Sequence, residues 1–245
     1  MTYFIAQEYD PFILNKKSNA PAEIDFCSET HSYFVNPGGL LGKVETTSAS
    51  HIITSVFGNK FINVKPEVLL RACTRGTTVH DEILNFIVKG EFGFTPEFRA
   101  AALEIKALME ASPDKIASEQ ILYCNNPFAN FCCMVDSWWA CRKHLVDYKT
   151  SNRLDKASVT RQLNIYAYAL ESNGYKVNSL EAWHLSEKGL RKYPIFLKDK
   201  SYVECILRAY SEGLQFKNDE EMLEHFNKGE KNANQERGSW SEIYY

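Results

Sequence analysis

The stretch that decides the fold is Leu145-Val146-Asp147-Tyr148-Lys149. Its branched and aromatic residues favour a β-strand, on which successive side chains point to opposite faces of a sheet. Asp147 and Lys149 therefore share one face, and Val146 and Tyr148 share the other. Burying either charged group without a partner is costly. The strand therefore predicts either an ion pair at a sheet edge or a cation bound by Asp147 with Lys149 beside it.

A second acidic residue lies upstream, in the apolar run 131–139. If the two runs form a hairpin, Asp136 comes next to Asp147 across the strands. Two like charges repel in that position unless a cation lies between them. The alternative is that Asp136 begins a turn, but Trp138 and Trp139 directly after it continue the apolar pattern.

Two helical stretches carry further polar residues. His80 borders the apolar side of residues 66–89, where a lone histidine is more often a hydrogen-bonded core residue than a ligand. Gln162 and Tyr166 lie four residues apart in 157–172, hence on one helix face. Both side chains have the chemistry to hydrogen-bond a phosphate, although Tyr166 also fits the apolar stripe of its helix.

The whole pattern predicts one α/β domain over residues 1–245. The expected order is helices at 66–89 (with a break near Gly76) and 95–111, strands at 119–124, 128–141 and 145–149, a helix at 157–172, strands at 180–185 and 192–197, and helices at 201–212 and 219–227. Residues 1–47 are expected to form an N-terminal extension, 48–200 the core, and 201–245 C-terminal helices and a polar tail.

Composition excludes some classes of protein. The 245 residues are 44% hydrophobic, carry a formal charge of −3 and contain no run long enough to span a membrane. The net charge counts against an extended, purely electrostatic grip on nucleic acid, but a bound divalent cation would add charge that this count misses. Seven cysteines without a CxxC pair argue against a zinc ribbon and for a reducing compartment. With no apparent secretory signal, we expect a cytoplasmic location.

Taken together, four motifs resemble the RecB-like exonuclease branch of the PD-(D/E)xK nuclease superfamily. They are Gly76-Thr-Thr-Val-His80, Cys133-Met-Val-Asp136, Val146-Asp-Tyr-Lys-Thr150 and Gln162-Leu-Asn-Ile-Tyr166. The resemblance covers residues 48–197. It implies a restriction-endonuclease-like core, with a mixed central β-sheet flanked by helices. It also implies a metal-dependent DNA exonuclease of recombination or repair, of phage or bacterial type, working alone, as a homo-oligomer or with a recombination partner protein.

The resemblance also implies roles for individual residues. His80, Asp136, Asp147 and the backbone carbonyl of Tyr148 would bind Mg²⁺ or Mn²⁺. Lys149 would position the attacking water and stabilise the developing charge. The remaining implied site residues are Glu119 as a further catalytic acid, and Gln162, Tyr166 and Arg75 as contacts to Lys149 and the substrate.

The sequence departs from the family pattern at two points. Cys133 replaces a glycine that usually lies three residues before the hairpin aspartate. Some relatives hold an iron–sulfur cluster with three late cysteines, whereas only Cys205 is late here, so we expect no cluster.

Two other interpretations remain open. One is a catalytically weak nuclease-fold protein that binds nucleic acid or a protein partner, which the acidic net charge favours and the intact Lys149 disfavours. The other is an unrelated α/β protein with surface ion pairs. The sequence does not decide whether the substrate is DNA or RNA, or whether cleavage is exonucleolytic or endonucleolytic.

Overall fold

The structure is a computed structural model that describes residues 24–27, 32–35, 42–112 and 114–228. The expectations for residues 1–23, Pro113 and the polar tail 229–245 lie outside them. The strands are β1 Ile24–Cys27, β2 Ser32–Val35, β3 Val44–Ser48, β4 Ile116–Cys124, β5 Phe131–Trp139, β6 His144–Lys149, β7 Ser179–Ser186 and β8 Gly189–Ile195. The helices are α2 Ala49–Phe57, α3 Pro66–Lys89, the 3₁₀ helix η2 Pro96–Phe98, α4 Arg99–Glu110, α5 Lys156–Ser172 and α6 Lys200–Ser211, and residues 219–228 are also helical.

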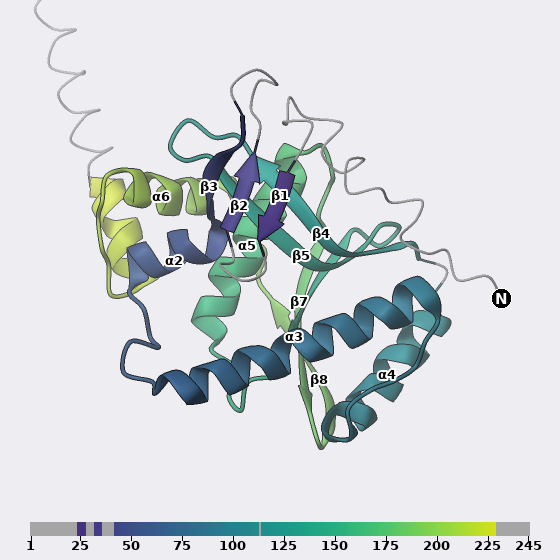
Figure 1. Cartoon of the computed structure of the whole chain (residues 1–245). Helices are drawn as coiled ribbons and strands as arrows, with labels where there is room; N and C mark the ends of the chain where they lie inside the picture. The colour runs from purple at the N-terminus through teal and green to yellow at the C-terminus, as the bar shows by residue number, and fades with distance from the viewer. Residues whose placement is uncertain (1–23, 28–31, 36–41, 113, 229–245) are drawn as a thin grey trace, which may run out of the picture.

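The strands form one mixed eight-stranded sheet in the order β1-β2-β3-β5-β6-β7-β8, with β4 paired to β5 off this path (Figure 1). The pairs β3–β5 and β6–β7 are parallel, and the others are antiparallel. Because β4 occupies one edge of β5, strands β3 and β6 share the other edge. β3 pairs with residues 131–132 and β6 with residues 137–139, so among the described residues no strand pairs with residues 133–136 along that edge.

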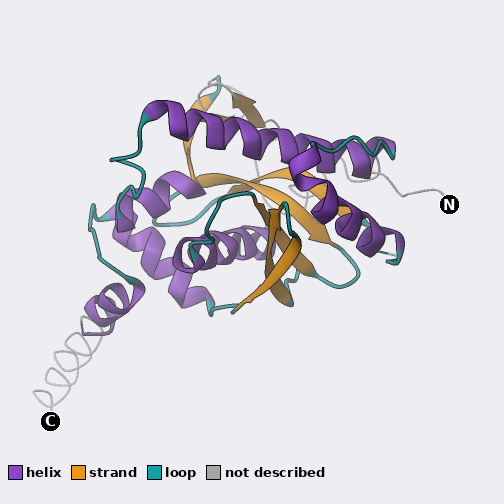
Figure 2. Cartoon of the chain, turned by 90° about the horizontal axis from the view of Figure 1, so that it is seen from below, coloured by secondary structure: helices purple, strands orange, loops and turns teal. Residues whose placement is uncertain are grey.

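Helices cover both faces of the sheet (Figure 2), which confirms the expected mixed α/β architecture. We call the larger cluster of buried side chains the α5 core, because Leu163 of α5 packs in it with Ile52 of α2 and Ile206 of α6. The α3 core lies on the opposite face, where Ile83 of α3 packs with Ile105 of α4 and side chains of the central strands. The site described below lies between these two layers.

Strand pairing and packing connect the segments that were expected within the single domain. β3 ends at Ser48, across the expected start of the core, and pairs with β5. Tyr202 and Ile206 of α6 are buried in the α5 core. Strand pairing and burial thus join both flanking segments to the central region.

Helix α3 is continuous, so the expected break near Gly76 is wrong. A glycine inside a helix costs only about 1 kcal/mol. The buried residues Val79, Ile83 and Phe86 anchor the following turns, and Gly90, with a φ of 71°, ends the helix in the left-handed conformation that glycine favours. Despite its length, α3 is too polar to cross a membrane, and no other described helix could do so.

Candidate metal and catalytic site

The side-chain alternation of β4 and β5 reverses at one place. Val135 and Trp138 are three residues apart in β5, yet both pack in the α5 core. Ala117 and Leu122 are five residues apart in β4, yet both also pack there. On a regular strand an odd separation puts side chains on opposite faces. In each strand, therefore, the alternation of side chains between the two faces of the sheet is reversed, within residues 118–121 of β4 and within residues 136–137 of β5.

Glu119 lies in that reversal, with a φ of 49° in the left-handed region. Such a conformation costs an L-residue roughly 1–2 kcal/mol. The flanking pairs Ser118–Ser137 and Gln120–Val135 place Glu119 opposite Asp136.

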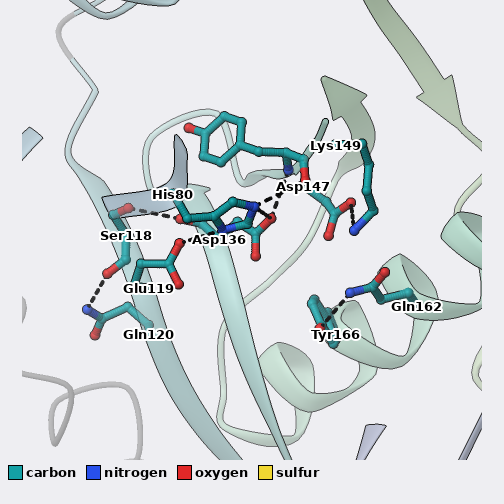
Figure 3. A network of polar contacts seen from close by, with 10 residues as sticks. His80, Ser118, Glu119, Gln120, Asp136, Asp147, Lys149, Gln162 and Tyr166 are labelled. Carbon is teal, nitrogen blue, oxygen red and sulfur yellow. Dashed lines mark hydrogen bonds and ion pairs between the residues drawn. The ribbon is translucent and has the colours of Figure 1, made fainter. Parts of the chain in front are cut away.

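Side chains replace the missing ladder contacts around this residue (Figure 3). Ser118 Oγ donates to the Asp136 carbonyl at 3.0 Å, and Gln120 Nε2 donates to the Ser118 carbonyl at 3.0 Å. Sequence reasoning did not include Ser118 or Gln120. The available signal was three consecutive polar residues, Ser118-Glu119-Gln120, at the start of the strand predicted over 119–124.

The backbone of Tyr148 faces the gap left between β3 and β6. The N–H and C=O groups of one strand residue point to the same neighbouring strand, and β5 has already diverged from β6 at this level. The Asp136 carboxylate accepts the Tyr148 N–H at 2.8 Å, and His80 Nε2 lies 3.3 Å from the Tyr148 carbonyl oxygen. The carbonyl expected to be a ligand therefore faces the histidine rather than a strand.

His80 brings α3 to the two acidic residues. Its Nδ1 lies 3.1 Å from Glu119 Oε1, and its Nε2 lies 3.8 Å from Asp136 Oδ2. Burial disfavours the charged imidazole, but Asp136 and Glu119 outweigh it and raise the pKa of His80 to about 9. One ligand atom from each of the three residues lies within 4.8 Å of the others.

Asp147 and Lys149 lie beside this group and contact each other. Lys149 Nζ is 2.7 Å from Asp147 Oδ2, and the Asp147 side chain is 1% exposed. Neither Asp147 oxygen has a hydrogen-bond partner of normal geometry. Burial raises the pKa of Asp147 to about 6, although Lys149 acts in the opposite direction. Burial also disfavours charge on Lys149, but Asp147 and Asp136 outweigh it and raise its pKa.

The structure thus divides the expected ligand set. It brings Glu119 into the group with His80 and Asp136, whereas Asp147 faces Lys149. Glu119 was expected only as a further catalytic acid.

On α5, Gln162 Nε2 donates to the Tyr166 hydroxyl at 2.8 Å. Tyr166 is buried in the α5 core, and burial raises its pKa far above the usual value. Within the described part of the chain, neither side chain hydrogen-bonds to Lys149. The expected support of Lys149 by direct contact is therefore not seen, although both residues lie on the same side of the site as Lys149 (Figure 3).

Arg75 lies on α3, five residues before His80. It donates from Nη2 to the Thr150 carbonyl at 3.0 Å and pairs through Nη1 with Glu97 at 3.4 Å. These contacts hold the end of β6 against α3. They give Arg75 a role in positioning β6, and the substrate contact expected of it stays a prediction.

The donor set fits a hard divalent cation. Two carboxylates, a backbone carbonyl and one imidazole converge, and oxygen-rich sites of this kind suit Mg²⁺ and Mn²⁺. Asp147 lies beside this donor set, buried, with the Lys149 ammonium as its charged partner. No protein-family model matches the sequence, and no curated protein is significantly similar to it. The functional proposal therefore rests on the chemistry of the site.

Proposed function

We propose that the protein is a metal-dependent nuclease of PD-(D/E)xK type that hydrolyses phosphodiester bonds. The observation that carries the proposal is the convergence of His80, Glu119 and Asp136 beside the buried Asp147–Lys149 pair. The motif order, which resembles RecB-like exonucleases, favours DNA as the substrate and attack from an end.

In this proposal, some residues bind the cation and others assist hydrolysis of the phosphodiester. His80, Glu119, Asp136 and the Tyr148 carbonyl would hold Mg²⁺ or Mn²⁺. A cation bound there would lower the pKa of water and offset phosphate charge. Lys149 stays protonated because neighbouring carboxylates raise its pKa, so it can donate a hydrogen bond to the oxygen on which charge develops. Asp147 holds Lys149 in place and adds negative charge beside the cation.

A digestion assay tests the activity itself. End-labelled linear DNA, circular DNA and linear RNA are incubated with Mg²⁺, Mn²⁺ or EDTA. Metal-dependent release of label from linear DNA, with circular DNA left intact, is the expected result. If wild-type protein cleaves none of these substrates in either metal, the alternative of a nuclease-fold binding protein is favoured.

Two substitutions separate metal binding from chemistry. Lys149→Gln removes the charged donor but no metal ligand, so the protein should keep its metal-induced rise in melting temperature. It should lose cleavage by about 10²–10³-fold, the usual loss when one transition-state donor is removed. Cleavage at the wild-type rate would rule out Lys149 as a catalytic residue.

The matched variant is Asp147→Asn, which removes a charge beside the cation as well as the partner of Lys149. It should lose cleavage and also show a smaller metal-induced rise. If Asp147 and Lys149 form only a structural ion pair, both variants should lose stability to similar extents with no separate effect on cleavage.

A further inference from the structure

A cleft of about 380 Å³ opens beside the end of β6, directly after Lys149. The loop that follows β6 and the hairpin of β7 and β8 form most of its wall. The polar residues that line it include Thr150, Ser151, Asn152, His184, Lys188 and Arg191.

The strand register places Lys149, His184 and Arg191 in one row across the sheet, and the last two of these residues line the cleft. Lys149 pairs with His184 on β7, and His184 pairs with Arg191 on β8. Residues directly opposite on adjacent strands point to the same face, and neighbouring strands lie about 4.8 Å apart, so the row spans roughly 10 Å.

The charges near the cleft are only partly neutralised. Of the carboxylates in its wall, Glu97 pairs with Arg75, and Glu187 is exposed at the hairpin turn. Lys149 is paired with Asp147, and His184 Nε2 contacts the Ser151 carbonyl. Among the described residues, neither Arg191 nor Lys188 forms an ion pair, and both are exposed. Arg191 is thus a guanidinium with its donors available, two strands from the catalytic lysine.

We propose that this cleft binds a phosphate of the substrate strand next to the phosphate that is cleaved, an inference that rests on the proposed nuclease function. Arg191 would bind it through two parallel hydrogen bonds, which the planar guanidinium forms with phosphate oxygens. The Asn152 side-chain amide adds a hydrogen-bond donor of the kind that commonly contacts nucleic-acid backbones. With Glu97 paired to Arg75, the cleft carries the cations Lys188 and Arg191 against the single carboxylate Glu187, a local excess of positive charge in a chain whose net charge is −3.

The test compares Arg191→Gln with Lys192→Gln. Lys192 is the next residue on β8, but its ammonium lies over the Trp183 ring, which packs in the α3 core on the other face of the sheet. Both variants lose one positive charge from the same strand, and only Arg191 faces the cleft.

Binding of labelled single-stranded DNA and RNA is measured by fluorescence anisotropy in EDTA over a range of salt concentrations. Arg191→Gln should lower affinity about tenfold, as expected for the loss of a charged hydrogen bond. It should reduce the slope of log K against log salt by about 0.7, the value for one phosphate contact to a single strand. Lys192→Gln should match wild type. Equal effects of the two variants, or no change in slope for Arg191→Gln, would overturn the proposal.

Cleavage assays separate this proposal from the nuclease function. Arg191→Gln should raise KM for oligonucleotides yet leave hydrolysis of bis(p-nitrophenyl) phosphate unchanged, because that small diester has no neighbouring phosphate. If wild type cleaves DNA and the variants Arg191→Gln and Lys192→Gln behave alike, phosphate binding in the cleft is refuted and the proposed nuclease activity is retained. Arg191-dependent binding without any cleavage would refute the nuclease and leave a phosphate-binding cleft. Inorganic phosphate as a competitor shows whether an isolated anion occupies it as readily as a strand does.

Discussion

At the scale of single residues, the site is built around a backbone that is held in an unfavourable conformation. Glu119 has a φ of 49°, and neighbouring side chains satisfy the groups that the strand ladder leaves free. Conformations of this kind persist where the surrounding structure enforces them, and they concentrate at functional sites. We therefore expect that the backbone conformation of Glu119 lowers the free energy of unfolding and that it is retained because it places the carboxylate against His80.

Two substitutions of Glu119 test this strain. Glycine adopts positive φ freely, whereas alanine does not. Glu119→Gly should therefore be more stable than Glu119→Ala by about 1 kcal/mol, which reverses their usual order in a strand. Chemical denaturation of the metal-free proteins measures the difference. Both variants lose the carboxylate equally, so a more stable alanine variant would show that the backbone is relaxed at this residue.

If His80 is a ligand of the proposed cation, metal binding should depend on pH. Its pKa is raised from 6.5 to about 9 in the metal-free protein, so its proton stabilises that fold fully below pH 6.5, and this stability is lost as the pH rises through about 9. A metal ligand must be neutral, so the cation competes with this proton. The metal-induced rise in melting temperature should therefore grow from pH 6.5 toward 9.

The control for this pH effect is His80→Gln, which should weaken the metal response and make it nearly independent of pH over the same range. Differential scanning fluorimetry with Mg²⁺ or EDTA at each pH gives the comparison. A metal response in wild type that stays constant or falls with pH would show that His80 is not the group that titrates.

At the scale of elements, the two ends of α3 differ in burial. Its later turns are buried through Val79, Ile83 and Phe86, whereas Val68 and Leu70 in its first turns are 55% and 67% exposed. His80 lies at the junction, where the helix meets the sheet. The position of His80 therefore depends on the helix remaining straight through Gly76.

Gly76→Ala should stabilise the protein by about 0.5–1 kcal/mol, because glycine pays a larger entropic cost in a helix than alanine. The added Cβ would meet Thr150 Oγ1 at 3.7 Å, an ordinary van der Waals contact. Gly189→Ala is the opposite case, since its φ is +109° and a Cβ there would lie 2.4 Å from Glu104 Oε1. Urea denaturation should rank the alanine variant of Gly76 above wild type and that of Gly189 below it.

At the scale of the whole molecule, the proposed cation links the two layers. Its ligands come from α3 on one face and from β4, β5 and β6 of the sheet. A ligand that binds only the folded state stabilises it. Mn²⁺ or Mg²⁺ should therefore raise the melting temperature, and EDTA should reverse the rise.

Asp136→Asn should abolish this metal response. In metal-free protein the variant should unfold at a somewhat lower temperature, because Asp136 is the main group that favours protonated His80, although burial of the ionised carboxylate offsets part of that contribution. Thermal unfolding with and without metal measures both expectations. A variant that responds to metal as strongly as wild type would place the cation elsewhere.

The sequence pattern predicted the order of the elements from α3 to α6, whereas strands β1 to β3 and helix α2 were not in the expected order. Alternation predicted the strand that carries Asp147 and Lys149, and the hairpin register indeed brings Asp136 toward Asp147, since the last observed pair is Ser137 with Val146. Helical spacing predicted α3 and α5. These features were accessible because periodicity and turn residues act over a few residues along the chain.

Only the tertiary structure decided how the side chains meet. The reversal at Glu119 has no periodic signature, because it depends on the sign of one φ angle and on pairing with β5. The contact of His80 with Glu119 spans 39 residues, and that of Arg75 with Thr150 spans 75. Local pattern cannot specify such contacts, since they form only after the sheet has fixed which residues face each other.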